Sequence, residues 1–427
     1  MPVPRAVEES PVRRERVREN LPLHAITAAR HLTVIVTLVI VRAHPLHRAF
    51  WGVAIVTAFA LVASLSVVGP VGQTNASATT DAAALQAQWM VRAGQSNTIF
   101  IVATSKCRAN PCVKLLRTDN EGRSFTTLSL PPVAPYQRNP TGTLDRLVFA
   151  DNEDGYILEG RAWNTMLFAT HDGGRSWNRV PVPRGSDITS LAATSSEVYL
   201  VTMHCQKQSN GNWGCLDYQL LHSRSRSAIW SSTVIPVGRF PLDASVGSLG
   251  VFGTRVWTTM MSSPKSSTLA VSSLLRSYDS GRTLTQVPAP ILGSINGCDL
   301  TAVSIKGLWA ACPTGMEVSF FFSDDAGTSW NRVPVSQFMG TGGGYFDPVS
   351  TTAAYLDYGE GLKGENIFRV TDAGRRMTAV GTLTCDDVSS FVFANSNDGL
   401  ALCSNDVTAI LERTTDAARR WHDVALK

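Results

Sequence analysis

A recurring run of polar residues is the clearest candidate for chemistry in this chain. In ATHDGGRSWNRV, residues 169–180, the carboxylate of Asp172 is followed by two glycines, a hydroxyl and Trp177. Such a group could form a site or close a tight turn. A carboxylate can accept hydrogen bonds from N–H groups of its own loop, and Gly174 can adopt a backbone conformation that is costly for other residues. We therefore interpret the run as a turn that places the tryptophan at the start of the next strand, wedged between sheets.

The same pattern returns along the chain at a nearly constant interval. Its acid position falls at residues 120, 172, 225, 279, 325, 372 and 416, which are 44 to 54 residues apart. Two copies match in full, and the others carry substitutions, such as asparagine or serine in the acid position. The residues that we assign to these turns are Asn120, Asp172, Gly174, Trp177, Asp279, Gly281, Asp325, Gly327, Trp330, Asp372, Gly374, Asp416 and Trp421.

The interval between copies predicts the elements that position these turns. About 50 residues is what four short strands and their connections require in a repeat protein. Strand and turn signals over residues 144–183 place the motif between the third and the fourth strand. We predict an all-β fold, a seven-bladed β-propeller of four-stranded antiparallel blades over residues 85–427. Each blade should hold all four of its strands, so that the ring closes by packing blade 7 against blade 1.

With these motifs the chain resembles the Asp-box (BNR) repeat β-propellers, which include sialidases, sortilin-type receptors and the photosystem II assembly and stability factors. The resemblance covers residues 85–427, and LFATHDGGRSWNRVPVP is most similar to the photosystem-factor type of repeat. It implies that the motif turns lie on the rim, away from any active site. It also implies a role in chaperoning a membrane complex.

Eight cysteines indicate an oxidising compartment. All of them follow an apolar segment near the amino end and none precedes it, which favours disulfides over reduced, buried thiols. In the predicted sheets, the end of the second strand shares an edge with the starts of the first and third strands. We therefore predict four disulfides on the face opposite the motif turns: Cys107–Cys112, Cys205–Cys215, Cys298–Cys312 and Cys385–Cys403.

Uneven loops on that same opposite face are the predicted ligand-binding surface. They lie at residues 131–142, 161–164, 206–214 and 336–347. Aromatic side chains together with arginines suit the recognition of a peptide or a sugar, although each could instead anchor its own loop. The candidate ligand-binding residues are Tyr136, Arg138, Arg161, Trp163, Trp213 and Tyr345.

Catalytic and cofactor motifs are not evident. A sialidase would need three arginines from separate blades, a Tyr/Glu pair and an acid, and no residues can be assigned those roles. The histidines show no metal-ligand spacing, and we predict no catalytic residue, no metal and no cofactor. No basic stripe with interleaved aromatics points to nucleic acid. A sialidase-like glycoside hydrolase remains the alternative function, favoured if Arg138, Arg161, Arg184 and Arg239 converge on one pocket.

The amino end predicts the location of the protein. Residues 1–48 are polar and arginine-rich, and Phe50–Val68 holds 19 residues without a charge, enough for a helix to span a bilayer. We assign 1–48 to the cytoplasm, 49–69 to a transmembrane or signal-anchor helix and 70–84 to a linker. Cleavage near Ala78 is the alternative, which would release a secreted protein.

These expectations combine into one functional prediction. The chain should be an extracytoplasmic binding or assembly platform without catalytic activity, attached to the membrane through residues 50–68. Its ligand should be a protein or a glycan, and the propeller should be monomeric. Because 38 basic residues are nearly balanced by 34 acidic ones, the net charge indicates no particular partner.

Overall fold

The structure, a computed structural model, describes residues 85–106, 111–131, 146–159, 165–183, 187–207, 213–236, 244–262, 270–291, 297–314, 317–334, 345–358, 366–385, 387–405 and 408–426. All described residues lie within one compact unit, Ala78–Lys427. The predicted span at residues 50–68 and the segments on either side of it lie outside the described ranges. Within those ranges, no helix has the length and apolar character needed to cross a membrane.

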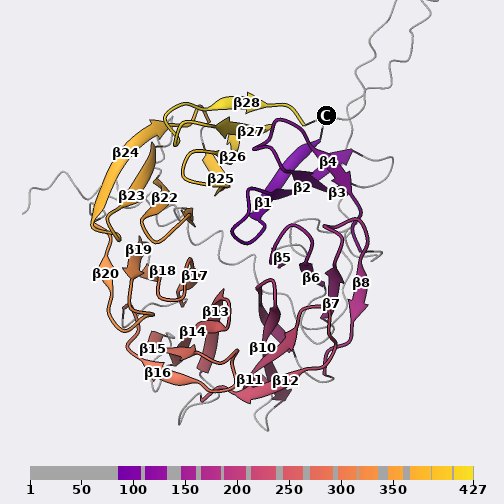
Figure 1. Cartoon of the computed structure of the whole chain (residues 1–427), viewed down its shortest axis with the longest axis vertical. Coiled ribbons are helices and arrows are strands. Elements are labelled where there is room, and N and C mark those ends of the chain that lie inside the picture. Colours follow the sequence, from indigo (N-terminus) through magenta and orange to yellow (C-terminus); the bar gives the residue numbers. More distant parts are fainter. Residues whose placement is uncertain are drawn as a thin grey trace, which may run out of the picture. The chain divides into compact units, whose positions relative to one another are not determined.

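Strands dominate the described residues and form seven sheets arranged around a central axis (Figure 1). Each sheet, or blade, has four strands in sequence order, and each strand pairs antiparallel with its neighbours. Blade 1 holds β1 (Gln86–Arg92), β2 (Ile99–Lys106), β3 (Pro111–Thr118) and β4 (Thr126–Leu128). Blade 2 holds β5 (Leu147–Phe149), β6 (Gly155–Glu159), β7 (Met166–Thr170) and β8 (Asn178–Val180). Blade 3 holds β9 (Asp187–Ala193), β10 (Glu197–Lys207), β11 (Trp213–Arg224) and β12 (Ser231–Val234).

The remaining blades repeat the same plan. Blade 4 holds β13 (Ala244–Phe252), β14 (Arg255–Ser262), β15 (Ala270–Ser277) and β16 (Thr285–Val287). Blade 5 holds β17 (Asp299–Ala302), β18 (Leu308–Thr314), β19 (Glu317–Ser323) and β20 (Asn331–Arg332). Blade 6 holds β21 (Phe346–Pro348), β22 (Ala353–Tyr358), β23 (Asn366–Thr371) and β24 (Arg376–Thr382). Blade 7 holds β25 (Asp387–Phe393), β26 (Gly399–Asn405), β27 (Thr408–Thr414) and β28 (His422–Val424). The predicted seven four-stranded blades are therefore confirmed.

The second strand of blade 2 is buried on both faces because a neighbouring blade covers each face. All five residues of β6 are buried, and its sequence GYILE shows none of the apolar–polar alternation of a sheet with one wet face. The outermost strand β8, by contrast, reads Asn-Arg-Val and is largely exposed. Each blade therefore contributes side chains to two cores, one on each side.

The seams between blades are filled by the residue that ends each motif. Trp177 packs against Phe149 and the apolar side chains of blade 1, and its Nε1 donates a hydrogen bond to the backbone oxygen of Ser129 at 3.0 Å. Trp230 repeats this contact one seam later, on the backbone oxygen of Pro181 at 2.8 Å. The matching positions that pack into the other five seams are Phe125, Leu284, Trp330, Met377 and Trp421.

The two ends of the described propeller each complete a blade of their own, so the ring closes without a blade built from strands of both ends. The seam between blade 7 and blade 1 has its own core, in which Leu400 and Leu402 pack against Ile99 and Ile101. The guanidinium of Arg92 adds hydrogen bonds to the backbone oxygens of Pro348 and Phe393, at 3.1 and 3.0 Å. Closure by packing, as the sequence predicts, is therefore confirmed.

Two of the predicted disulfides are present in the described residues, Cys298–Cys312 and Cys385–Cys403. Cys205 is also disulfide-bonded, and the register of β10 with β11 places Cys215 directly opposite it. Cys107 lies outside the described residues, so its predicted bond to Cys112 stays a prediction.

Candidate functional site

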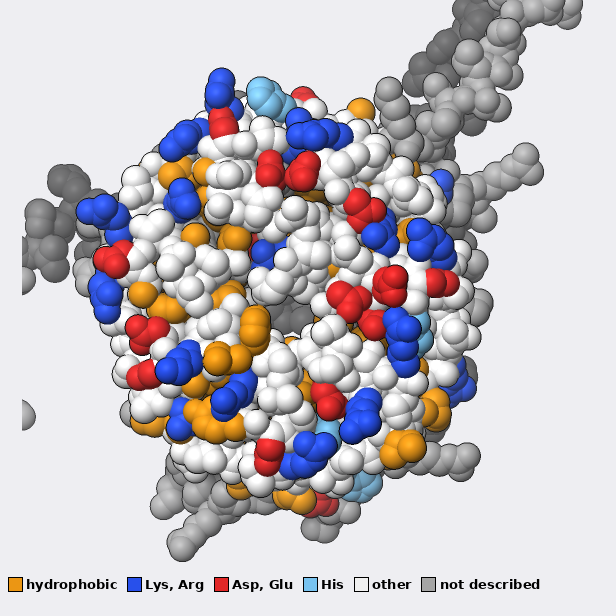
Figure 2. Space-filling view, in the orientation of Figure 1, with side chains coloured by type: hydrophobic (Ala, Val, Ile, Leu, Met, Phe, Trp, Pro, Cys, Tyr) orange, Lys and Arg blue, Asp and Glu red, His pale blue; other side chains and the backbone are white. Residues whose placement is uncertain are grey.

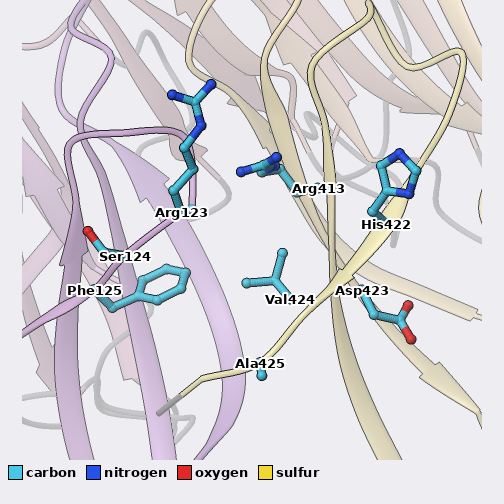
Figure 3. Close-up of a pocket in the computed structure, with 9 residues that line it drawn as sticks. Arg123, Ser124, Phe125, Arg413, His422, Asp423, Val424 and Ala425 are labelled. Carbon is cyan, nitrogen blue, oxygen red and sulfur yellow. The ribbon is translucent and has the colours of Figure 1, made fainter.

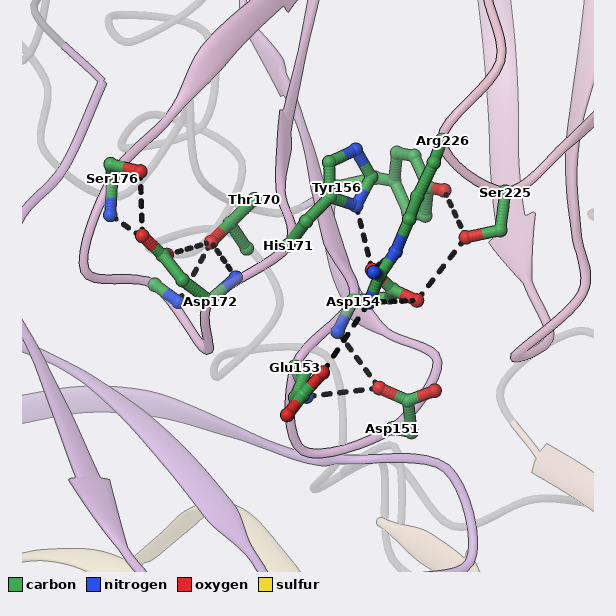
Figure 4. A network of polar contacts seen from close by, with 11 residues as sticks. Asp151, Glu153, Asp154, Tyr156, Thr170, His171, Asp172, Ser176, Ser225 and Arg226 are labelled. Carbon is green, nitrogen blue, oxygen red and sulfur yellow. Dashed lines mark hydrogen bonds and ion pairs between the residues drawn. The ribbon is translucent and has the colours of Figure 1, made fainter.

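The turn between β7 and β8 is built around the carboxylate of Asp172 (Figure 4). Its Oδ1 accepts hydrogen bonds from Ser176 N at 2.9 Å and Thr170 Oγ1 at 2.8 Å, and its Oδ2 accepts one from Ser176 Oγ at 2.6 Å. Gly174, at φ +86°, donates its N–H to Thr170 Oγ1 at 2.8 Å. The hydrogen bonds from Ser176 are the main reason that the pKa of Asp172 falls to about 2. Because its own turn occupies the carboxylate, this group is a structural element rather than a ligand site.

The turn of blade 1 keeps this geometry without the charge. Asn120 Oδ1 accepts a hydrogen bond from Ser124 N at 2.9 Å, and Gly122 N donates to Thr118 Oγ1 at 2.8 Å. An amide can replace the carboxylate as acceptor, but it brings no negative charge. The hydrogen-bond acceptor of this motif turn is therefore uncharged, whereas its counterpart in blade 2 is a carboxylate; in blade 1 the carboxylates of Asp119 and Glu121 stand on either side of Asn120 in the sequence.

The arginine that follows the motif glycine makes different contacts in blade 1 from those in blades 2 and 4. In blades 2 and 4, Arg175 and Arg282 fold back, and each Nη1 donates to the backbone oxygen of its own motif acid, at 2.7 and 3.0 Å. Arg123 in blade 1 instead extends into solvent with 62% of its side chain exposed, and its only ion pair among the described residues is a 3.8 Å contact with Glu121. Its guanidinium therefore lies where a ligand from solvent can compete with the 3.8 Å contact to Glu121.

A second arginine position, immediately before the first motif hydroxyl, shows the same contrast. Arg117 of blade 1 donates to a backbone oxygen of blade 2 at 2.9 Å, and Arg276 of blade 4 donates to Thr328 Oγ1 of blade 5 at 2.8 Å. Arg413 of blade 7 occupies the same place and is half-buried, but among the described residues its guanidinium has no hydrogen bond or ion pair. The seam between the last and first blades thus lacks the contact that this arginine makes between blades 1 and 2 and between blades 4 and 5.

These two arginines line an open pocket of about 640 Å³ where blade 7 meets blade 1 (Figure 3). We call it the closure pocket. In Figure 3 the guanidinium groups of Arg123 and Arg413 lie on one side, Phe125 and Val424 lie on the other, and the carboxylate of Asp423 points away from the centre. The complete set of lining residues is Gly122, Arg123, Ser124, Phe125, Arg413, His422, Asp423, Val424 and Ala425.

The chemistry of the closure pocket suits an anion attached to an apolar group. Two guanidinium groups without strong anionic partners can each bind a carboxylate through paired N–H donors. Phe125 and Val424 offer an apolar surface beside them. On the face of the molecule shown in Figure 2, basic and acidic side chains are interspersed around the rim rather than gathered in one field.

A second polar cluster joins blades 2 and 3, and its centre is the buried carboxylate of Asp154 (Figure 4). Arg226 Nε donates to Asp154 Oδ1 at 3.2 Å, and Ser225 Oγ donates to Oδ2 at 3.3 Å. His171 Nδ1 lies 2.6 Å from the same Oδ1, and the hydroxyl of Tyr156 lies 3.2 Å from Ser225 Oγ. The substituted motif of blade 3, with serine in the acid position, thus reaches across the seam to hold an acid of blade 2. We interpret the cluster as a structural tie.

Glu159, at the end of β6, is a buried carboxylate without a hydrogen-bond partner for either oxygen. Burial raises its pKa to about 7. A further acid, Glu412, lies with the sulfur atoms of Cys385 and Cys403 so that the three ligand atoms are within 4.8 Å of one another. These two acids belong to no motif that the sequence displays.

Most of the predicted ligand-binding residues cannot be placed. Tyr136, Arg138, Arg161 and Trp163 lie outside the described residues, as do Arg184 and Arg239, so the convergence of arginines that a sialidase needs is not tested. Trp213 begins β11 opposite Lys207. Tyr345, just before β21, is 40% exposed, and its backbone oxygen accepts a hydrogen bond from Asp357 N.

The closure pocket was not predicted from the sequence, because it depends on contacts that Arg123 and Arg413 lack and that arginines at the same positions of other blades make. The motif pattern alone gives Arg123 and Arg413 the same surroundings as the arginines of other blades. One signal was nevertheless present in the sequence. Asparagine in place of the acid at position 120 removes a negative charge from the turn that Arg123 and Arg413 flank.

No protein-family model and no curated protein matches the sequence. The fold is similar to several solved structures. With puromycin hydrolase the TM-score is 0.54 at 11% identity, over 80% of this chain and 54% of that one, so the chain spans about half the length of that enzyme. With the β-propeller domain of the Trilobed protease from Pyrococcus furiosus the TM-score is 0.52 at 8% identity, over 80% and 96% of the chains. With YCF48 bound to D1 peptide the TM-score is 0.44 at 16% identity, over 66% of this chain and 81% of that one. At these identities the comparisons show that the chain shares the β-propeller fold, and they show the fold alone.

Proposed function

We propose that the protein is a non-catalytic platform that binds an acidic segment of a partner protein in the closure pocket. The observation that carries this proposal is the pair of guanidinium groups of Arg123, which has only a 3.8 Å contact with Glu121, and Arg413, beside the apolar side chains of Phe125 and Val424. A peptide can present a carboxylate and a neighbouring apolar side chain at this spacing. Buried arginine and aromatic contacts are the ones that contribute most to protein binding.

The proposal places this platform outside the cytoplasm. Support comes from the disulfides of blades 5 and 7, since such bonds persist in oxidising compartments. The apolar segment at residues 50–68 would attach the propeller to the membrane, with its arginine-rich head on the cytoplasmic side.

The absence of catalysis is part of the same proposal. In the motif turns, carboxylates such as Asp172 accept hydrogen bonds from their own loops, and the buried Asp154 is held by Arg226, His171 and Ser225. Neither arrangement leaves a carboxylate ready to act on a substrate. The likeness to puromycin hydrolase adds no argument for hydrolysis, because this chain spans only about half of that enzyme's length.

The test is site-specific photocrosslinking of the full chain in the cells that produce it. A photoreactive amino acid in place of Ala425, which lines the pocket and leaves both guanidinium groups intact, should form an adduct with a partner protein. The same amino acid in place of Val234, the equivalent and exposed position of blade 3, should not form that adduct. Adding Arg413→Met to the Ala425 probe should lower the adduct yield several-fold, because one of the two guanidinium groups is lost.

Two results would contradict the proposal. Equal adducts at the two positions, or none at position 425, would show that the closure pocket is not a docking site. Turnover of a fluorogenic sialoside by the purified chain would show that the propeller is catalytic.

A further inference from the structure

The last blade brings a disulfide and an acidic side chain together in its interior. Cys385 and Cys403 are bonded to each other, and neither is exposed. Glu412 on β27 is also 0% exposed. One of its carboxylate oxygens and the two sulfur atoms lie within 4.8 Å of one another, a spacing at which all three could contact one metal ion.

The carboxylate of Glu412 is only partly satisfied in this position. Its Oε1 accepts hydrogen bonds from Thr384 N at 3.2 Å and Thr384 Oγ1 at 2.5 Å, and it lies 3.9 Å from Cys403 Sγ. Its Oε2 has no hydrogen-bond partner. A fully buried carboxylate oxygen without a partner costs stability, and a cation bound to this carboxylate would offset that cost.

Blade 5 carries the same kind of disulfide without the acid. Cys312 and Cys403 occupy equivalent places on the second strand, since Cys312 pairs with Ser319 and Cys403 pairs with Ile410. Two residues further along the third strand, blade 5 has the apolar Phe321 where blade 7 has Glu412. A disulfide at this place therefore does not require a carboxylate for its packing.

We propose that blade 7 contains a reduction-dependent metal site, in which the thiolates of Cys385 and Cys403 and the carboxylate of Glu412 bind a zinc-type divalent cation. A dithiol reductant supplies two electrons and two protons: the bond between the two cysteine sulfurs breaks, and the reductant becomes a disulfide. Each cysteine thiol then releases one proton as its sulfur binds the cation. Oxidation reverses the sequence and expels the ion.

The donor set determines the class of metal. Two thiolates and one carboxylate are ligands that zinc accepts in tetrahedral sites, whereas magnesium and calcium select oxygen ligands alone. Three protein ligands leave the fourth position to a water molecule. The hydrogen bonds from Thr384 to Oε1 would orient the carboxylate, as partners of metal ligands do in other proteins.

The experiment uses the full chain, reduced without oxygen by a phosphine and titrated with Co²⁺ as a spectroscopic probe. We expect thiolate-to-cobalt charge-transfer bands from one tight site. Glu412→Gln should weaken binding at that site at least about tenfold, and Cys385→Ser with Cys403→Ser should abolish it. The matched control, Cys298→Ser with Cys312→Ser in blade 5, should leave the tight site unchanged. The oxidised chain should bind no cobalt there.

A measurement on the unaltered chain guards against variants that fail to fold. X-ray absorption of the reduced, zinc-loaded protein should show two sulfur ligands and at least one oxygen ligand. A shell of sulfur alone, or one without sulfur, would overturn the proposal. So would cobalt affinity that is insensitive to Glu412→Gln, or that is lost in the blade 5 control but kept in the blade 7 variant.

Discussion

The indole nitrogen of Trp177 donates a hydrogen bond to the backbone oxygen of Ser129, 3.0 Å away in the preceding blade. The ring also packs edge-on against Phe149. Trp177→Phe should keep part of the packing and lose this hydrogen bond, lowering the free energy of unfolding by about 1 to 2 kcal/mol. Trp177→Ala should lower it by about 3 kcal/mol or more. Urea unfolding of the full chain measures both, and equal losses would show that the ring does not fill the seam.

The acid of the motif turn should be replaceable by an amide but not by a methyl group. Asp172→Ala removes the acceptor for Ser176 N and Oγ and should lower the free energy of unfolding by about 1 to 3 kcal/mol. Asp172→Asn should lower it by less, because Asn120 already accepts the equivalent hydrogen bond from Ser124 N. Thermal unfolding of the two variants in parallel measures and compares the two losses of stability. If the asparagine variant is as unstable as the alanine variant, the turn depends on charge rather than on the acceptor.

The last motif turn offers a stabilising substitution. Ala418 stands where five of the other six copies have glycine and adopts φ +65°, a left-handed conformation that costs a residue with a Cβ about 1 kcal/mol. Ala418→Gly should therefore raise the free energy of unfolding by up to about 1 kcal/mol. Gly174→Ala, the reverse change at φ +86°, should lower it. A destabilising effect of Ala418→Gly would mean that the methyl group packs better than its backbone strain suggests.

Glu159 should make stability depend on pH near neutrality. Burial raises its pKa from 4.5 to about 7, so between these values the folded state holds a proton that the unfolded state releases. The stability that the protonated Glu159 side chain allows is fully present below pH 4.5 and is lost as the pH rises through 7. Glu159→Gln should thus be more stable than the unaltered chain at pH 8, by on the order of 3 kcal/mol, and should show no such gain at pH 4.

The control for this pH profile is Glu153→Gln, which alters a carboxylate with 69% of its side chain exposed. Its stability difference should stay small at both pH values, since surface ion pairs contribute little. Chemical unfolding across the pH range checks both variants. A flat difference for Glu159→Gln would refute the raised pKa.

The blades could be predicted because each motif encodes a local structure. The hydrogen bonds of Asp172 involve residues within four positions, so spacing alone is enough to identify the turn. The bond between Cys298 and Cys312 followed from the same repeat, since both fall at one edge of a four-stranded sheet. Periodic sequence translates directly into periodic structure when the contacts are this short in range.

The candidate site could not be predicted, because it arises between blades that are far apart in sequence. Arg413 lines the closure pocket together with Arg123 only because the ring brings the seventh blade to the first. Glu412 gave no signal either, since its position beside Cys403 follows from the register of β26 with β27. In the sequence, Ser225 is only a substitution at the acid position of the motif. In the structure it donates a hydrogen bond to Asp154 of the neighbouring blade.

Because β1 to β4 and β25 to β28 each form a complete sheet, no blade is assembled from distant pieces of chain. Leu85 and Leu426, at the two ends of the described propeller, pack against the same core. Joining these ends with a short linker and opening the chain at a different seam should therefore give a circular permutant with the same architecture. The order in which the blades are synthesised is thus separable from the structure that they form.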